Sequence, residues 1–191
     1  MSGVSGSAAS EGQQPALEQA RRLARADEPA LTAIYEARRG ELLAFLLRMT
    51  HDLDEAEDLL QECFVALIRE ADAGRMPAEV RPWLYRVAAN AAVSRRRRVS
   101  RWTRLLPRLL DGSQPDHPEG VALRDERRAD IRAALGRLRP DGRAALLLVA
   151  EGFSGREIAA ALGRSEDATR TLLCRSRVQL RRLLEAAEAR P

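Results

Sequence analysis

Arginine is the residue type in this sequence whose spacing points most directly to chemistry. All 32 basic residues are arginine. Four are consecutive, Arg95 to Arg98, and the stretch from Val80 to Leu110 holds nine arginines and no acid. A guanidinium donates paired hydrogen bonds to phosphate oxygens and to guanine edges. Such a surface fits a polyanion, although a run of charge can also be only a solvated helix face.

The stretch before these arginines carries the opposite charge. Between Met49 and Glu79 there are nine acids and two arginines. A sequence that changes sign so sharply offers two different surfaces, each suited to a different partner. The overall net charge of +4 does not reveal this division.

The residue types that most often carry catalysis or bind metals are few and isolated. His51 and His117 have no cysteine or second histidine at metal-ligand spacing, and Cys63 and Cys174 belong to no Cys-x-x-Cys pair. The sequence also lacks a glycine-rich phosphate loop and the Gly-x-Ser-x-Gly and His-Glu-x-x-His motifs. We therefore expect no metal, no cofactor and no enzymatic activity.

The most specific local pattern is FSGREIAAALGRSEDATRTLLCRSRVQLRRLL, residues 153–184. Ser154 followed by Glu157 is a capping box that begins a helix. Gly163 ends that helix in the left-handed conformation, and Ser165 caps the next one. Two short helices joined by a glycine turn, the second with arginines on its outer side, predict a helix-turn-helix. An ordinary helical hairpin with a solvated arginine face is the alternative interpretation.

Composition and periodicity favour helices throughout. Hydrophobic residues make up 45% of the chain and aromatic residues only 4%, and there are no strand-forming runs. Apolar residues recur at steps of three and four over 31–49 and 54–69, and a third helix runs from about Pro82 into the arginines. The prolines and glycines of PRLLDGSQPDHPEG, residues 107–120, mark a linker.

The predicted fold is therefore all-α, with two small helical domains joined by a flexible linker and a helix-turn-helix in the second domain. The N-terminus lacks the apolar core of a signal peptide, and no segment approaches the length of a membrane span. We expect a cytoplasmic protein without membrane insertion. The expected parts are a disordered N-terminal extension (1–15), a first domain (16–98), the linker (99–123) and a second domain (124–188).

Three motifs occur together in one order. DEAEDLLQECFVALIR (54–69), WLYRVAANAAVSRRRR (83–98) and the C-terminal helix-turn-helix resemble a bacterial RNA polymerase sigma factor. The type is the short extracytoplasmic-function group, which keeps only regions two and four, and the resemblance covers roughly residues 25–98 and 127–184. It implies an alternative sigma factor that binds core polymerase, recognises the minus-thirty-five promoter element and melts the minus-ten element.

The resemblance also implies partners and a polymerase-binding site. Asp58, Gln61 and Glu62 stand where residues of the family dock on the beta-prime clamp helices of core RNA polymerase. The other implied partners are the polymerase beta flap, promoter DNA and an anti-sigma factor. A merely solvated acidic helix face is the alternative for these three residues.

Two sets of residues are implied to contact promoter DNA. Asn90 stands where a flipped base of the minus-ten element is read, and the residues after it would hold the melted strand: Ser94, Arg95, Arg96, Arg97 and Arg98. Arg156 is implied to contact a phosphate beside the minus-thirty-five element. The residues implied to read that element in the major groove are Arg170, Thr171, Cys174 and Arg175.

Several positions depart from the family pattern. Leu172 stands where the family usually has arginine, and Cys174 replaces a larger residue. Thr169 replaces a valine, Ser176 an alanine and Ser94 a common aspartate. These departures bear on which promoter is recognised more than on the fold. A leucine at 172 either contacts a thymine methyl or packs inward.

Two other classes of function compete with the sigma factor. A stand-alone helix-turn-helix regulator would leave the acidic segment 54–69 and the segment 83–98 without a function. A helical adaptor that binds only proteins would not need nine arginines in a stretch free of acids. Salt-dependent DNA binding distinguishes the adaptor from the first two classes.

Overall fold

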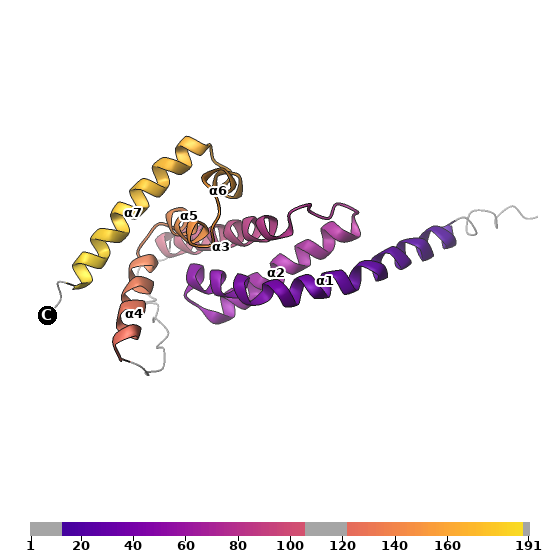
Figure 1. Ribbon diagram of the computed structural model, residues 1–191, viewed down its shortest axis with the longest axis horizontal. Helices are drawn as coiled ribbons and strands as arrows, with labels where there is room; N and C mark the ends of the chain where they lie inside the picture. Colours follow the sequence, from indigo (N-terminus) through magenta and orange to yellow (C-terminus); the bar gives the residue numbers. More distant parts are fainter. Residues whose placement is uncertain (1–12, 106–121, 189–191) are drawn as a thin grey trace, which may run out of the picture.

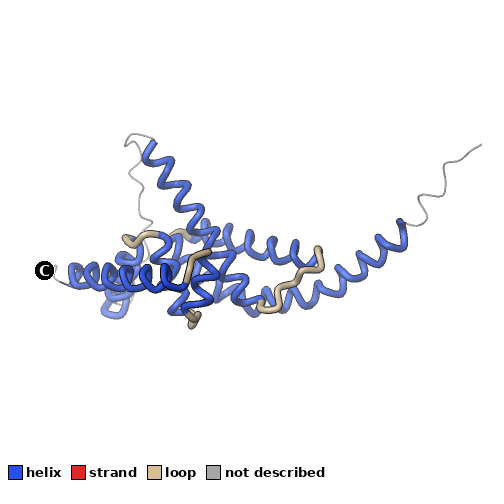
Figure 2. Tube along the Cα trace, turned by 90° about the horizontal axis from the view of Figure 1, so that it is seen from above, coloured by secondary structure: helices blue, strands red, loops and turns tan. Residues whose placement is uncertain are grey.

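The structure is a computed structural model that describes residues 13–105 and 122–188. Within these ranges the chain forms helices and loops and no β-strand (Figure 2), which confirms the expected all-α class. The helices are α1 (Gln13–Thr50), α2 (Leu53–Asp72), α3 (Val80–Leu105), α4 (Ala122–Gly136), α5 (Pro140–Ala150), α6 (Gly155–Leu162) and α7 (Glu166–Glu188).

Helices α1, α2 and α3 form the N-terminal half, with α1 and α2 side by side (Figure 1). α1 ends at Thr50 because His51 takes a positive φ of 63°. Asp52 then begins α2, since its carboxylate accepts the Glu55 backbone N–H at 2.8 Å. α2 buries one side against α1 and α3 and exposes the other. The buried side chains are Ala56, Leu59, Leu60, Cys63, Phe64 and Leu67.

Helices α4 to α7 form the C-terminal half, and the predicted helix-turn-helix is present. Ser154 and Glu157 make both hydrogen bonds of a capping box at the start of α6. Gly163 ends α6 with a φ of 62°, and the Ser165 hydroxyl accepts the Ala168 N–H at 3.2 Å. α7 packs on α5 at Gly142, where an added Cβ would lie 2.4 Å from the Ser176 hydroxyl oxygen.

The two halves pack directly against each other. α5 and α6 lie against α3, and α5 also contacts α1, so α5 and α6 separate α7 from the N-terminal half (Figure 1). Buried residues of both halves form one hydrophobic cluster, which includes Phe45 and Tyr85 from one half and Leu148 and Ile158 from the other. The sequence predicted two domains joined by a linker and did not predict this contact.

Parts of the expected organisation lie outside the described residues. These are residues 1–12 of the predicted N-terminal extension and residues 106–121 of the predicted linker. α1 already begins at Gln13, and α3 continues to Leu105, so the start of the predicted linker is helical. The domain boundaries stay a prediction. No helix in the described ranges is both long enough and apolar enough to cross a membrane.

Candidate polymerase and promoter surfaces

The three predicted polymerase-binding residues lie together on the solvent side of α2. Asp58, Gln61 and Glu62 are exposed, and their spacing of three and four residues places them on one helix face. Glu55 lies one turn before Asp58 and is half-buried. We call these four residues the α2 polar face. It offers carboxylate and amide oxygens to a basic partner.

Arg95 of α3 lies against the α2 polar face. Its Nη2 is 3.2 Å from the Asp58 carboxylate, its Nε is 3.5 Å from Glu55, and its Nη1 is 3.7 Å from Glu62. A residue predicted to bind promoter DNA therefore contacts two of the residues predicted to bind polymerase. Helical spacing places Glu55 on the same face as Asp58, but the sequence gives no sign of its contact with Arg95, because the two residues are far apart in the chain.

The other predicted minus-ten residues differ in their surroundings. Asn90 and Ser94, four residues apart on α3, are both exposed. Arg96 is half-buried, and its charge lowers the pKa values of His51 and Arg143. Arg97 reaches the C-terminal half, where its Nη2 lies 2.8 Å from both carboxylate oxygens of Asp141, and Arg98 is exposed. The four consecutive arginines therefore do not form one uniform surface.

His51 lies where the two halves meet, close to Arg96, Arg132 and Arg143. Burial and the positive charges of Arg143, Arg96 and Arg132 lower its pKa from 6.5 to about 4. The ring is therefore neutral at neutral pH. No group of three or more metal-binding side chains occurs in the described part of the chain.

The segment of α3 that carries Trp83 and Tyr85 packs against the hydrophobic core. Leu84 and Tyr85 are buried, and Trp83 packs against the core while partly exposed. The Tyr85 hydroxyl donates to the Glu151 carboxylate at 2.9 Å. Burial and this hydrogen bond raise the Tyr85 pKa. Sequence analysis missed this contact because nothing local to Tyr85 or Glu151 indicates it.

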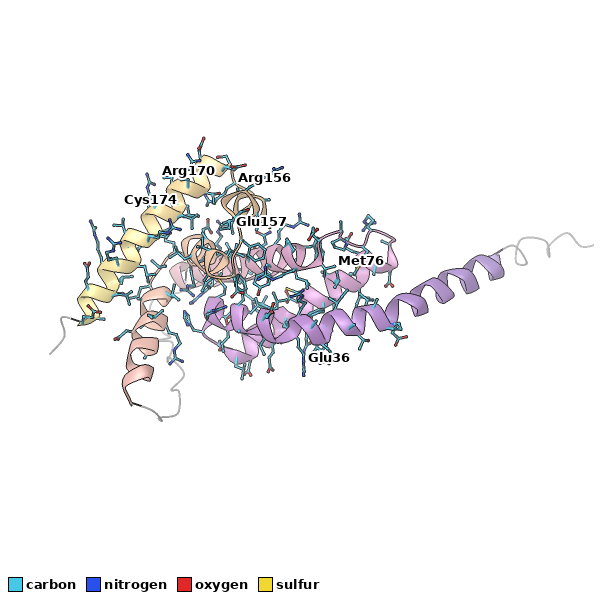
Figure 3. All side chains as sticks on the ribbon, viewed as in Figure 1. Glu36, Met76, Arg156, Glu157, Arg170 and Cys174 are labelled. Carbon is cyan, nitrogen blue, oxygen red and sulfur yellow. The ribbon has the colours of Figure 1, made fainter. Side chains whose placement is uncertain are left out.

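The predicted minus-thirty-five residues gather on the outer side of the helix-turn-helix. All five are exposed: Arg156 on α6, and Arg170, Thr171, Cys174 and Arg175 on α7. Figure 3 shows Arg156, Arg170 and Cys174 on the part of the molecule formed by α6 and α7, away from Glu36 of α1. Arg170 is also 3.3 Å from Asp167, one turn earlier.

The opposite side of α7 packs inward. Helical steps of three and four predict that Thr169, Leu173 and Ser176 share the inner face of this helix, and all three are buried. Leu172 is partly buried and packs against the core. Leu172 was predicted either to contact a thymine methyl or to pack inward, and its partial burial agrees with inward packing.

Comparison with known proteins supports the division into two halves. The Sigma-70 region 2 family matches residues 34–103, and the Sigma-70 region 4 family matches residues 128–180. The RNA polymerase sigma-H factor of Pseudomonas aeruginosa is 30% identical over 175 residues, which cover 86% of this chain and 91% of that protein. The ECF sigma factor SigG of Mycobacterium tuberculosis is 34% identical, but the chain spans only 55% of its length.

Two solved structures share the arrangement of the helices. The sigma factor RpoE of Bartonella quintana, solved with the anti-sigma factor NepR, matches with a TM-score of 0.64 and 26% identity over 81% of this chain and 96% of that one. CnrH, solved with the cytosolic domain of CnrY, matches with a TM-score of 0.58 and 29% identity over 87% and 95%. The chain belongs to the extracytoplasmic-function group of the sigma-70 family of RNA polymerase sigma factors.

Proposed function

We propose that this chain is an alternative sigma factor that binds core RNA polymerase and directs it to specific promoters. The observation that carries the proposal is the presence of three polar surfaces on a matched pair of sigma regions. These are the α2 polar face, the exposed polar residues of α3 and the outer side of the helix-turn-helix. Binding and positioning alone account for this role, so it requires no catalytic residue.

In this proposal the α2 polar face docks on the beta-prime clamp helices through Asp58, Gln61 and Glu62, and the C-terminal half meets the beta flap. The three side chains are exposed and share one helix face. Their apolar neighbours on α2 are buried in the core, so the face is held rigidly. A rigid acidic face suits a basic partner helix, because little side-chain and backbone order is lost on binding.

At the minus-ten element, Asn90 reads an extruded base, and Ser94 with Arg95 to Arg98 holds the separated strand. Extruding a base costs a few kcal/mol of pairing and stacking energy. A positive surface that follows the strand offsets part of this cost. The exposure of Asn90 and Ser94 on the same side of α3 supports this assignment.

At the minus-thirty-five element, α7 enters the major groove. Arg170, Thr171, Cys174 and Arg175 face the bases, and Arg156 of α6 contacts a phosphate. A bidentate arginine–guanine pair discriminates by about 1–3 kcal/mol. The Arg170 side chain is 80% exposed, and its ion pair with Asp167 is also exposed, so rearrangement of Arg170 toward a base costs little.

An anti-sigma factor is the expected regulator. The similar sigma factor RpoE of Bartonella quintana is solved in complex with the anti-sigma factor NepR, and the similar protein CnrH is solved with the cytosolic domain of CnrY. We propose that a partner of this class binds this chain too. Loss of transcription on adding that partner to the reconstituted holoenzyme would identify it.

The test is transcription from a library of random upstream sequences by core polymerase with and without this protein. We expect transcripts that require the protein and share two fixed upstream sequence blocks about 25 base pairs apart, or about 85 Å of B-DNA. Arg170→Ala should relax selection in the upstream block, and Asn90→Ala should weaken it in the downstream block.

The matched control is Arg182→Ala, which removes an exposed arginine near the C-terminal end of α7, three turns beyond Arg170. It should leave the selected sequence unchanged. Transcripts that do not depend on the protein, or that show no shared upstream blocks, would overturn the proposed function.

A further inference from the structure

The two ends of α5 carry acids that bind arginines of the N-terminal half. Asp141 lies in the first turn of α5, and Glu151 follows its last residue. Asp141 contacts Arg97, and Glu151 contacts Arg48 and Arg81. We call these five residues the α5 bridge. It is distinct from the surfaces assigned to polymerase and to the minus-thirty-five element.

Glu151 is the most connected member of the bridge. Its carboxylate is paired with Arg48 of α1, accepts the Tyr85 hydroxyl at 2.9 Å and lies 3.8 Å from Arg81. Its backbone carbonyl accepts a second bond from Arg81 at 2.9 Å. The Glu151 side chain is only 15% exposed, so these charges are screened much less than at an open surface.

Two aromatic rings lie beside Arg81, one of the arginines that bind Glu151. The Arg81 guanidinium lies 4.7 Å from the centroid of Phe153 and 5.0 Å from that of Tyr85. The two rings are 5.0 Å apart, and both residues are buried. Phe153 belongs to the C-terminal half and Tyr85 to the N-terminal half, so separating the halves would expose both rings to water.

Asp141 binds Arg97, which is proposed to contact promoter DNA. Its carboxylate accepts two hydrogen bonds of 2.8 Å from Arg97 and is also paired with Arg164, which follows the turn glycine of the helix-turn-helix. Both hydrogen bonds come from Arg97 Nη2, so the Asp141 carboxylate holds a donor that could otherwise bind a phosphate. While this contact persists, Arg97 has to break it in order to hold a promoter strand.

The bridge also fixes the distance between the two DNA-binding halves. Packed helices lie 8–10 Å apart, so two helix layers hold α7 at about 20 Å from α3. On the proposed function, the minus-ten and minus-thirty-five elements are about 25 base pairs apart, or about 85 Å of B-DNA. The bridged arrangement cannot bind both elements of one promoter at once.

We propose that the α5 bridge closes the chain on itself, so that the protein alone is held in a state that cannot engage a whole promoter. The closed arrangement does not depend on the proposed function. Only its consequence for promoter binding rests on that function. The bridge opens when the halves bind separate sites, and opening breaks the contact between Asp141 and Arg97. The anti-sigma factor is not needed to form the closed state.

The test is a distance measurement on the full chain without polymerase or DNA. One dye is placed on exposed Cys174 and the other on a cysteine introduced by Glu57→Cys on exposed α2, while Cys63 is buried. We expect one short-distance population in this background. Adding Glu151→Gln together with Asp141→Asn should raise the ratio of open to closed molecules by about tenfold or more, which is about 1.4 kcal/mol.

Two controls make the result specific. Glu185→Gln removes one charge from an exposed position of α7 and should leave the distances unchanged. Asp141→Asn alone removes only one of the two acids, so it should raise the ratio of open to closed molecules by less than the double variant does. Helix content by circular dichroism should match the parent chain in each variant. Unchanged distances in a folded double variant would overturn the proposal.

A second readout connects the bridge to DNA. Binding to one random-sequence duplex should be tighter for Asp141→Asn than for Glu185→Gln, although both remove one negative charge from the same half. Equal binding would contradict the role given to the contact between Asp141 and Arg97. The distance measurement uses no polymerase, so it can support the α5 bridge even if the library experiment contradicts the proposed function. The library experiment can likewise support the proposed function even if the distances contradict the bridge.

Discussion

Arg95 shows how a single side chain can belong to two surfaces. It contacts Glu55, Asp58 and Glu62 of the α2 polar face and is also proposed to hold promoter DNA. Exposed ion pairs contribute about 0–1 kcal/mol each. A phosphate can therefore displace these acids from Arg95, and a basic polymerase helix can displace Arg95 from the acids. Binding of either partner should help binding of the other.

His51 should make stability depend on pH. Its pKa is about 4 in the fold and 6.5 when unfolded, so the unfolded chain binds the proton more tightly. This contribution to stability is complete above pH 6.5 and is lost as the pH falls toward 4. At about 1.4 kcal/mol per pKa unit, the difference between 6.5 and about 4 gives an expected loss of about 3 kcal/mol. Urea unfolding of the wild-type chain at a series of pH values measures it.

The matched variant is His51→Asn, because asparagine tolerates the positive φ at this position and does not titrate. The difference in unfolding free energy between the two proteins should change between neutral and acid pH. The charged groups that face the ring are Arg96 of α3, Arg132 of α4 and Arg143 of α5. A difference independent of pH would show that His51 is not held neutral.

Gly142 should be intolerant of alanine although it lies in a helix. Alanine would normally stabilise a helix interior by about 0.5–1 kcal/mol. Here the new Cβ would meet the Ser176 hydroxyl oxygen at 2.4 Å, so we expect a net loss of about 1–3 kcal/mol. Chemical denaturation measures it, and Ser176→Ala in the same chain should restore most of the loss. Failure of that rescue would place the strain elsewhere.

At the scale of helices, the local signals in the sequence were reliable. The capping box at Ser154, the left-handed Gly163 and the buried positions of α7 are confirmed, because each depends on residues within one or two turns. The apolar spacing over 54–69 predicts that Ile68 packs inward, but this prediction is wrong because Ile68 is 43% exposed. Helical spacing defines a face, but its width depends on what packs against it.

The ends of α1 and α4 are joined by a buried arginine that the sequence did not single out. Arg143 of α5 is 2% exposed and donates to the carbonyls of Leu135, Gly136 and Met49 at 2.8, 2.6 and 2.5 Å. Burial lowers its pKa to about 10, so it is still charged at neutral pH. The cation therefore lies at two carboxyl-terminal helix ends, where carbonyl groups lack helical partners.

Arg143→Met should therefore destabilise the fold strongly. Methionine fills much of the volume but leaves three carbonyls without their donor, and we expect a loss of about 3 kcal/mol or more. Denaturant unfolding measures this, with Arg137→Met as the control at an exposed position of the neighbouring loop. Similar stability of the two variants would contradict the role given to Arg143.

At the scale of the molecule, the sequence predicted the parts but not their assembly. The acidic helix, the arginine-rich helix and the helix-turn-helix each have a local signal. The contacts that join the halves do not, because Tyr85 and Glu151 are 66 positions apart, and Arg48 and Glu151 are 103 apart. Single charged residues at such separations carry no pattern that reveals their pairing.

The central claim is that the α2 polar face binds core RNA polymerase. The most direct measurement is the affinity of bacterial core polymerase for the wild-type chain, for Asp58→Arg and for Glu28→Arg. Glu28→Arg is the control, because it reverses the same charge at an exposed position of α1 outside the α2 polar face. We predict nanomolar binding by the wild type and by Glu28→Arg, and a loss of at least about a hundredfold for Asp58→Arg, or about 2.7 kcal/mol. No binding by the wild type, or equal binding by all three, would contradict the account.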